Sequence, residues 1–185
     1  MERNLQVIGI TGHPASGKDT VAAYLVFRGF SKISMGDILR EEMTAQGIPI
    51  DRSHMNEFAK KVRAERGNGY LSEEIVRRVK GNTTIAGVRN TSEVVIFRNG
   101  LGENFKLLAV ETPLETRYAR AKARGRIGDD VSFEQFKIED ERERAAQSGS
   151  HEVSTVIESA DMSLQNDGTM EDLYKKVDDY VASLQ

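Results

Sequence analysis

The chain has 185 residues, no cysteine and a formal net charge of −3, from 26 basic and 29 acidic side chains. The absence of cysteine excludes disulfides and thiolate zinc sites. Because acidic side chains outnumber basic ones, the protein has no overall positive charge that would attract nucleic acid. No apolar run approaches the length of a membrane span, and no signal peptide precedes the first predicted strand. We therefore expect a cytoplasmic protein without membrane or nucleic-acid partners. Composition leaves its oligomeric state open.

Apolar, β-branched runs alternate with helical patterns along the whole chain. Strands are predicted at residues 5–11, 30–35, 82–88, 106–111 and 161–165. Helices are predicted at residues 20–27, 36–46, 51–66, 72–81, 92–99, 113–124, 132–147, 153–159 and 170–184. Five strands separated by helices indicate the α/β class, as a doubly wound five-stranded parallel sheet that binds ligands at the carboxyl ends of its strands. We expect one domain, residues 1–185, with insertions at about residues 37–80 and 125–150.

A glycine loop joins the first predicted strand to the first predicted helix. Gly12 and Gly17 enclose four residues and Lys18 follows, which matches the phosphate-binding loop (P-loop) pattern G-x-x-x-x-G-K. The glycines let backbone N–H groups curl around phosphate, the helix N-terminus adds positive charge, and Lys18 can reach the β- and γ-phosphates of a nucleotide. We therefore predict ATP binding by Gly12, Pro14, Ala15, Ser16, Gly17, Lys18, Asp19 and Thr20.

The position after Lys18 departs from the pattern. A Ser or Thr usually stands there and supplies a hydroxyl ligand to Mg²⁺, whereas this chain has Asp19. Because Mg²⁺ prefers oxygen ligands, Asp19 is a candidate ligand, directly or through water, and Thr20 is a weaker one. A general base for an acceptor hydroxyl is the alternative role of Asp19. His13 is predicted to be an outer residue of the loop.

Charged residues follow the carboxyl ends of the later predicted strands. Arg40 and Arg89 stand after the second and third strands, and Arg120 and Arg124 lie four apart on one face of the helix after the fourth. Solvated surface cations are one interpretation of these arginines. The P-loop upstream favours the other, phosphate clamps, since the fork of a guanidinium matches the oxygens of a phosphate.

Four motifs at these strand ends occur in the order found in adenylate kinases, and the chain resembles the nucleoside monophosphate kinase branch of the P-loop kinases. The motifs are Ser34-x-Gly36-Asp37-x-Leu39-Arg40, Gly87-x-Arg89, Arg120-x-x-x-Arg124 and Asn166-Asp167-Gly168-Thr169. The chain is also similar to an archaeal kinase family related to dephospho-CoA kinase, to phosphomevalonate kinase of the P-loop type, to phage deoxynucleotide kinase and to a mevalonate 3-phosphate kinase of acidophilic archaea. The resemblance covers nearly the whole chain and is weakest at residues 41–81.

The resemblance implies a role for each motif. It makes residues 37–80 the acceptor-binding insertion and residues 125–150 a lid over the reacting groups. To the catalytic roles predicted above for Lys18 and Asp19 it adds roles for Asp37, Arg120 and Arg124. It also implies ATP contacts for Arg120, Asn166 and Gly168, and acceptor contacts for Asp37, Arg40, Arg89 and Glu93. Lys137 and Arg142 are further candidates for a contact with the γ-phosphate.

The third strand carries a second departure. In much of the family it ends Asp-Gly-x-Arg and the Asp holds Mg²⁺ through water, whereas this chain has Ala86.

We expect a kinase that uses ATP and Mg²⁺ and transfers the γ-phosphate to a small phosphorylated metabolite, either a nucleoside monophosphate or a mevalonate phosphate such as mevalonate 3-phosphate. The alternatives are hydroxyl phosphorylation like that of dephospho-CoA kinase, and a nucleotide-dependent ATPase switch or binding module.

Overall fold

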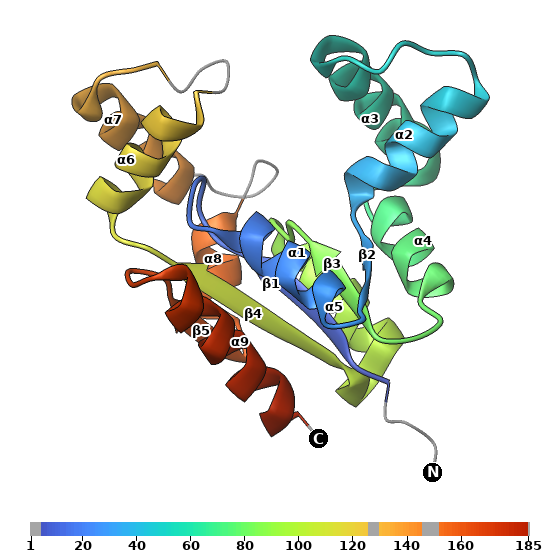
Figure 1. Ribbon diagram of the computed structural model, residues 1–185. Helices are drawn as coiled ribbons and strands as arrows, with labels where there is room; N and C mark the ends of the chain where they lie inside the picture. Colours follow the sequence, from blue (N-terminus) through green and yellow to red (C-terminus); the bar gives the residue numbers. More distant parts are fainter. Residues whose placement is uncertain (1–4, 126–129, 146–151, 185) are drawn as a thin grey trace.

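A five-stranded, all-parallel sheet in the order β2-β3-β1-β4-β5 forms the centre of the computed structural model, which describes residues 5–125, 130–145 and 152–184 (Figure 1). The strands are β1 (Val7–Thr11), β2 (Ser31–Ile33), β3 (Thr83–Ala86), β4 (Phe105–Glu111) and β5 (Met162–Gln165). The helices are α1 (Lys18–Phe27), α2 (Met35–Ala45), α3 (Arg52–Arg66), α4 (Tyr70–Arg78), α5 (Thr91–Leu101), α6 (Leu114–Arg124), α7 (Phe133–Ala145), α8 (Val153–Glu158) and α9 (Met170–Ser183), with a short 3₁₀ turn at Gly102–Asn104. The predicted α/β fold is confirmed.

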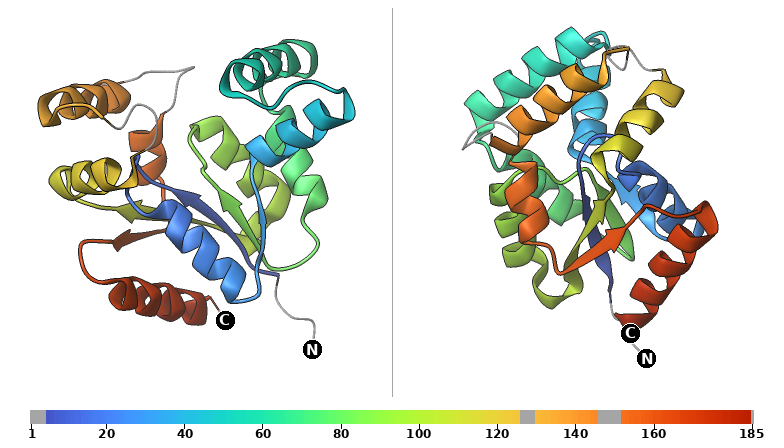
Figure 2. Two further views of the ribbon diagram at one scale, coloured as in Figure 1. Left: turned by 45° about the horizontal axis from the view of Figure 1, so that its top comes forward. Right: turned by 90° about the vertical axis from the view of Figure 1, so that its left-hand side faces the viewer.

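Helices cover both faces of the sheet, as the continuous apolar strands require. On one face lie α1 (blue) and α9 (dark red; Figure 2, left). Leu25 and Val177 of these helices are buried in one core with Ile8 and Ile10 of β1. On the other face, α4, α5 and α8 belong to a second core that includes Phe97. Every residue of β1 is buried, so the loop that follows it begins at the centre of the sheet edge.

The two predicted insertions lie on opposite sides of that loop. Helices α2 and α3 rise on one side of the carboxyl edge of the sheet, and α6 and α7 rise on the other (Figures 1 and 2). Glu42 of α2 links this helix to α3 and α4, because Tyr70 of α4 donates a hydrogen bond to it at 2.8 Å and Arg66 of α3 forms an ion pair with it at 3.1 Å. Residues 126–129 and 146–150 of the predicted lid lie outside the described residues.

Several predicted boundaries differ from the structure by two or three residues, and three of these differences have an identifiable cause. Helix α1 starts at Lys18 rather than at residue 20, because Gly17 takes the left-handed conformation and the helix follows directly. Strand β2 ends at Ile33 rather than at residue 35, since the Ser34 hydroxyl accepts a hydrogen bond from the Asp37 N–H and caps α2. Helix α4 starts at Tyr70 instead of Ser72, because the hydrogen bond from Tyr70 to Glu42 of α2 holds two more residues in the helix.

None of the helices in the described ranges is both long enough and apolar enough to cross a membrane.

Candidate active site

The glycine loop folds into a tight cradle. Gly12 has φ +148°, and a Cβ there would lie 2.5 Å from the carbonyl oxygen of Val110. Gly17 has φ +93°, and a Cβ there would lie 2.2 Å from Nδ2 of Asn166. No other residue type fits either position, so the backbone can approach a ligand closely. Lys18 Nζ donates to the carbonyl oxygen of His13 at 3.3 Å, which holds the ammonium group across the loop.

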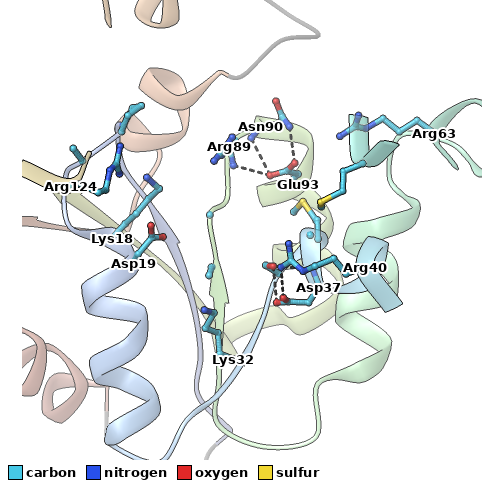
Figure 3. Close-up of a pocket in the computed structure, with 18 residues that line it drawn as sticks. Lys18, Asp19, Lys32, Asp37, Arg40, Arg63, Arg89, Asn90, Glu93 and Arg124 are labelled. Atoms are coloured by element: carbon cyan, nitrogen blue, oxygen red, sulfur yellow. Dashed lines mark hydrogen bonds and ion pairs between the residues drawn. The ribbon is translucent and has the colours of Figure 1, made fainter. Parts of the chain in front are cut away.

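Two cavities meet at this loop. The larger cavity, about 580 Å³, extends from the loop toward α2 and α3 (Figure 3). The smaller cavity, about 200 Å³, lies between the loop and α6 and is lined by Ala15, Gly17, Lys18, Asp19, Thr20, Arg120 and Arg124. Lys18, Asp19 and Arg124 line both cavities, so the same charged groups face two neighbouring spaces.

The larger cavity has a surplus of positive charge. Its cations are Lys18, Lys32, Arg40, Arg63, Arg89 and Arg124, and its carboxylates are Asp19, Asp37 and Glu93. Two of the three carboxylates already accept hydrogen bonds from the protein. The remaining positive charge suits an anionic ligand, and phosphate is the anion that arginine forks match best.

Asp37 and Arg40 form an ion pair at the start of α2. Arg40 Nη2 donates to Asp37 Oδ1 at 2.6 Å, and the Ser34 hydroxyl donates to Oδ2 at 2.7 Å. Burial raises the pKa of Asp37, but the hydrogen bonds from Ser34 and Arg40 outweigh it and leave the pKa below its usual range. A lowered pKa makes a weaker base, so this geometry favours Asp37 as the group that orients Arg40.

Glu93 holds the turn that presents Arg89. Its Oε2 accepts hydrogen bonds from the backbone N–H of Arg89 at 2.8 Å and of Asn90 at 3.2 Å, and its Oε1 accepts from the Asn90 side chain at 2.7 Å. This arrangement is a capping box at the start of α5. Glu93 lines the larger cavity, as the prediction of an acceptor contact requires, but its oxygens are already used to shape the loop.

Asn166 lies behind the P-loop. Its Nδ2 donates to the carbonyl oxygen of Ser16 at 2.8 Å, and its Oδ1 accepts from Arg120 Nη2 at 3.4 Å. Neither Asn166 nor Gly168 lines either of the two cavities. The adenine contact of these residues stays a prediction, and the observed contacts make Asn166 a support of the loop.

Comparisons with known proteins show the family to which the chain belongs. Residues 11–137 match the model of a family described as AAA domain. A UPF0200 protein of Thermococcus kodakarensis is 33% identical over 96% of this chain and 100% of its own length. The chain belongs to the UPF0200 family. A UPF0200/UPF0201 protein of Archaeoglobus fulgidus is 31% identical over 96% of this chain, which spans 55% of that relative.

Solved structures place this UPF0200 chain in the P-loop kinase fold. Shikimate kinase from Bacteroides thetaiotaomicron has a TM-score of 0.60 at 14% identity, over 96% of this chain and 99% of that one. Dephospho-CoA kinase from Campylobacter jejuni has a TM-score of 0.60 at 16% identity, over 96% of each chain. The predicted resemblance to P-loop kinases is confirmed at the level of the fold.

The oxygen donors beside the loop fit a magnesium ion that arrives with nucleotide phosphates. Asp19 is exposed, lines both cavities and makes no hydrogen bond or ion pair with the described residues. Thr20 lines the smaller cavity, and Ala86 adds no oxygen to the larger one. Mg²⁺ keeps several waters and needs only one or two carboxylates besides phosphate oxygens, so Asp19 with Thr20 is a sufficient set.

The structure adds residues that the sequence analysis missed. Lys32 and Arg63 line the larger cavity, from β2 and α3, and Thr112 bonds to the P-loop. Lys32 stands two residues before the cap of α2 and could have been found from its place at a strand end. Arg63 has no such signal, because it lies within a charged helix. Lys137 and Arg142 are exposed and line neither cavity.

Proposed function

We propose that this UPF0200 protein is an ATP-dependent kinase that transfers the γ-phosphoryl group to a small phosphorylated metabolite. The observation that carries the proposal is the shared lining of the two cavities. Lys18, Asp19 and Arg124 face both the space beside the P-loop and the cation-rich space toward α2 and α3. A phosphoryl group held at this junction has a nucleotide on one side and an acceptor on the other.

The residues at the junction suit phosphoryl transfer. The bond from the γ-phosphorus to the bridging oxygen of ADP breaks as an acceptor oxygen bonds to the same phosphorus, and the charge spreads over the transferring group. Lys18 and the P-loop amides hold the phosphates, while Arg120 and Arg124 of α6 neutralise the developing charge. Mg²⁺, when bound near Asp19, supplies further charge neutralisation.

The acceptor side supports a ligand that already carries phosphate. Arg40 and Arg89 line the larger cavity from two neighbouring strand ends, and Lys32 and Arg63 add two more cations. A nucleoside monophosphate or a mevalonate phosphate such as mevalonate 3-phosphate meets this requirement. Dephospho-CoA carries phosphate too, and transfer of the γ-phosphoryl group of ATP to one of its hydroxyls is the runner-up reaction.

Release of ADP from ATP tests the proposal. The purified protein is assayed alone and with nucleoside monophosphates, mevalonate 3-phosphate and dephospho-CoA as separate additions. Strong stimulation by one compound, with a matching phosphorylated product by mass spectrometry, supports the kinase and identifies its acceptor. Slow hydrolysis that no compound stimulates contradicts the kinase and favours a nucleotide-dependent switch.

Removal of an acceptor-side arginine is expected to weaken acceptor binding. Arg40→Ala and Arg89→Ala should each raise the acceptor KM roughly 10- to 100-fold, the value of a hydrogen bond to a charged group, with ATP affinity nearly unchanged. Arg77→Ala, on the exposed surface of α4, is the matched control and should behave as the parent. Steady-state kinetics with each substrate varied in turn checks the result. Weaker ATP binding with an unchanged acceptor KM would place the acceptor elsewhere.

The role of Asp19 is expected to depend on magnesium. Asp19→Ser restores a usual P-loop hydroxyl but leaves no carboxylate at Ala86, so activity should fall roughly 10- to 100-fold and the Mg²⁺ requirement should rise. Adding Ala86→Asp should recover part of the loss, because both sites would serve one ion. Mg²⁺ titrations of the parent, both single variants and the double variant measure this coupling.

A general-base role for Asp19 has a different signature. Asp19→Ser should then lower kcat with little change in Mg²⁺ dependence, and Ala86→Asp should rescue nothing. The acidic limb of the pH–rate profile should also disappear, because that limb reports the base. Parent-like activity at every pH and Mg²⁺ concentration would contradict both roles.

A further inference from the structure

A buried ion pair joins the two lid-side helices α6 and α7. Arg117 Nη1 donates to Asp140 Oδ1 at 2.7 Å, and the side chains are 1% and 6% exposed. Arg117 Nη2 is buried without a hydrogen-bond partner among the described residues. The cost of removing both charges from water makes such a pair a poor source of stability, and an unsatisfied donor adds to that cost. The benefit that remains is a fixed placement of α6 relative to α7.

The pair is connected to the P-loop by two routes. Arg117 Nε donates to the carbonyl oxygen of Thr112 at 3.1 Å, and the Thr112 hydroxyl lies 2.9 Å from the carbonyl oxygen of Ser16 in the loop. On the other side, Asp140 Oδ1 lies 4.0 Å from Nδ1 of the buried His13, the second residue of the loop. Helix α7 is thus linked to the loop through Arg117 and also approaches it directly.

Arg117 also sets the rotation of α6 about its axis. Arg120 and Arg124 follow Arg117 at i+3 and i+7, so the three side chains share one face of the helix. Arg120 Nη1 donates to the Thr112 hydroxyl at 3.3 Å, next to the Arg117 contact with the carbonyl oxygen of the same residue. Fixing Arg117 at Thr112 therefore directs Arg120 and Arg124 toward the smaller cavity, which both of them line.

We propose that Arg117 and Asp140 are positioning residues that hold α6 and α7 against the P-loop so that Arg120 and Arg124 face the phosphates of a bound nucleotide. The part of this proposal that concerns phosphoryl transfer rests on the proposed kinase function. The part that concerns nucleotide binding needs no acceptor.

A double-mutant cycle on nucleotide affinity tests the proposal. Arg117→Met with Asp140→Leu replaces the ion pair by apolar side chains, an exchange that buried pairs often tolerate. In the parent, Arg120→Ala should weaken AMPPNP binding about tenfold, the value of one charge-assisted hydrogen bond. In the apolar-pair background, Arg120→Ala should weaken it less than about threefold, because Arg120 is no longer held in place. Isothermal titration calorimetry measures all four affinities. The same tenfold loss in both backgrounds would overturn the proposal.

Two further variants separate positioning from folding. Lys122→Ala with Asp130→Ala removes an exposed ion pair that also involves α6 and should leave the contribution of Arg120 at about tenfold. If the apolar pair does not fold, as judged by circular dichroism, Arg117→Lys replaces it, because it keeps the charge but loses the fork that contacts Thr112 and Asp140 together. A folded Arg117→Lys protein in which Arg120 keeps its full contribution would also overturn the proposal. If the ADP-release assay finds no acceptor, only the proposed kinase function is contradicted. The double-mutant cycle uses AMPPNP and needs no acceptor.

Discussion

Lys18→Ala is expected to lower the rate of phosphoryl transfer by about 10³-fold or more while leaving the protein folded. The ammonium group of Lys18 is the only positive charge of the P-loop itself, and it lines both cavities. Loss of one preorganised donor on a developing charge typically costs on the order of 10²–10³-fold, and Lys18 carries a full charge as well. The fold survives because the loop conformation depends on Gly12 and Gly17, which do not change.

The measurement combines turnover with thermal unfolding. ADP release under saturating substrates gives the loss of activity, and the melting temperature should stay close to that of the parent. Lys175→Ala is the matched control for loss of one lysine, because Lys175 is an exposed residue of α9 that pairs with Asp179. Near-normal turnover in a folded Lys18→Ala protein would remove the P-loop assignment.

Arg124→Ala is expected to lower kcat on the order of 10³-fold with little change in the acceptor KM, because one arginine on a transferring phosphoryl group contributes about 10³–10⁵ in rate. Arg124 lines both cavities, whereas Arg120 lines only the smaller of the two, so we expect Arg124 to contribute more than Arg120 at the transferring group. Arg120→Ala should lower kcat too and should also weaken nucleotide binding. Interactions that form only in the transition state change kcat rather than KM.

Full kinetics on each variant distinguish the two arginines. Lys122→Ala, which removes a neighbouring exposed cation of α6, is the control and should keep the parent kcat. An increase in the acceptor KM at constant kcat would show that Arg124 binds the acceptor in its ground state. It would then belong with Arg40 and Arg89.

Much of the fold follows from local patterns in the sequence. The apolar strand, the G-x-x-x-x-G-K loop and the helix after it are contiguous, so short-range spacing determines the cradle. Its central place in the sheet follows from the strand order β2-β3-β1-β4-β5. A helix was predicted from residue 51, and Asp51 caps it, because its Oδ1 accepts a hydrogen bond from the His54 N–H at 3.0 Å. Because the carboxyl ends of parallel strands share one edge, the motifs after different strands were also expected to meet, and the larger cavity gathers Asp37, Arg40 and Arg89.

The tertiary structure decided which charged side chains face the ligand and which hold the site together. Arg117 looks like one more cation of a basic helix in the sequence, yet it is buried in an ion pair with Asp140, 23 positions away. Glu93 and Asn166 were predicted to touch ligands, but most of their hydrogen-bonding capacity supports the loops. Arg63 faces the cavity only because α3 packs beside α2. A side chain's partner depends on distances between segments that are far apart in the chain, and local periodicity contains no information about those distances.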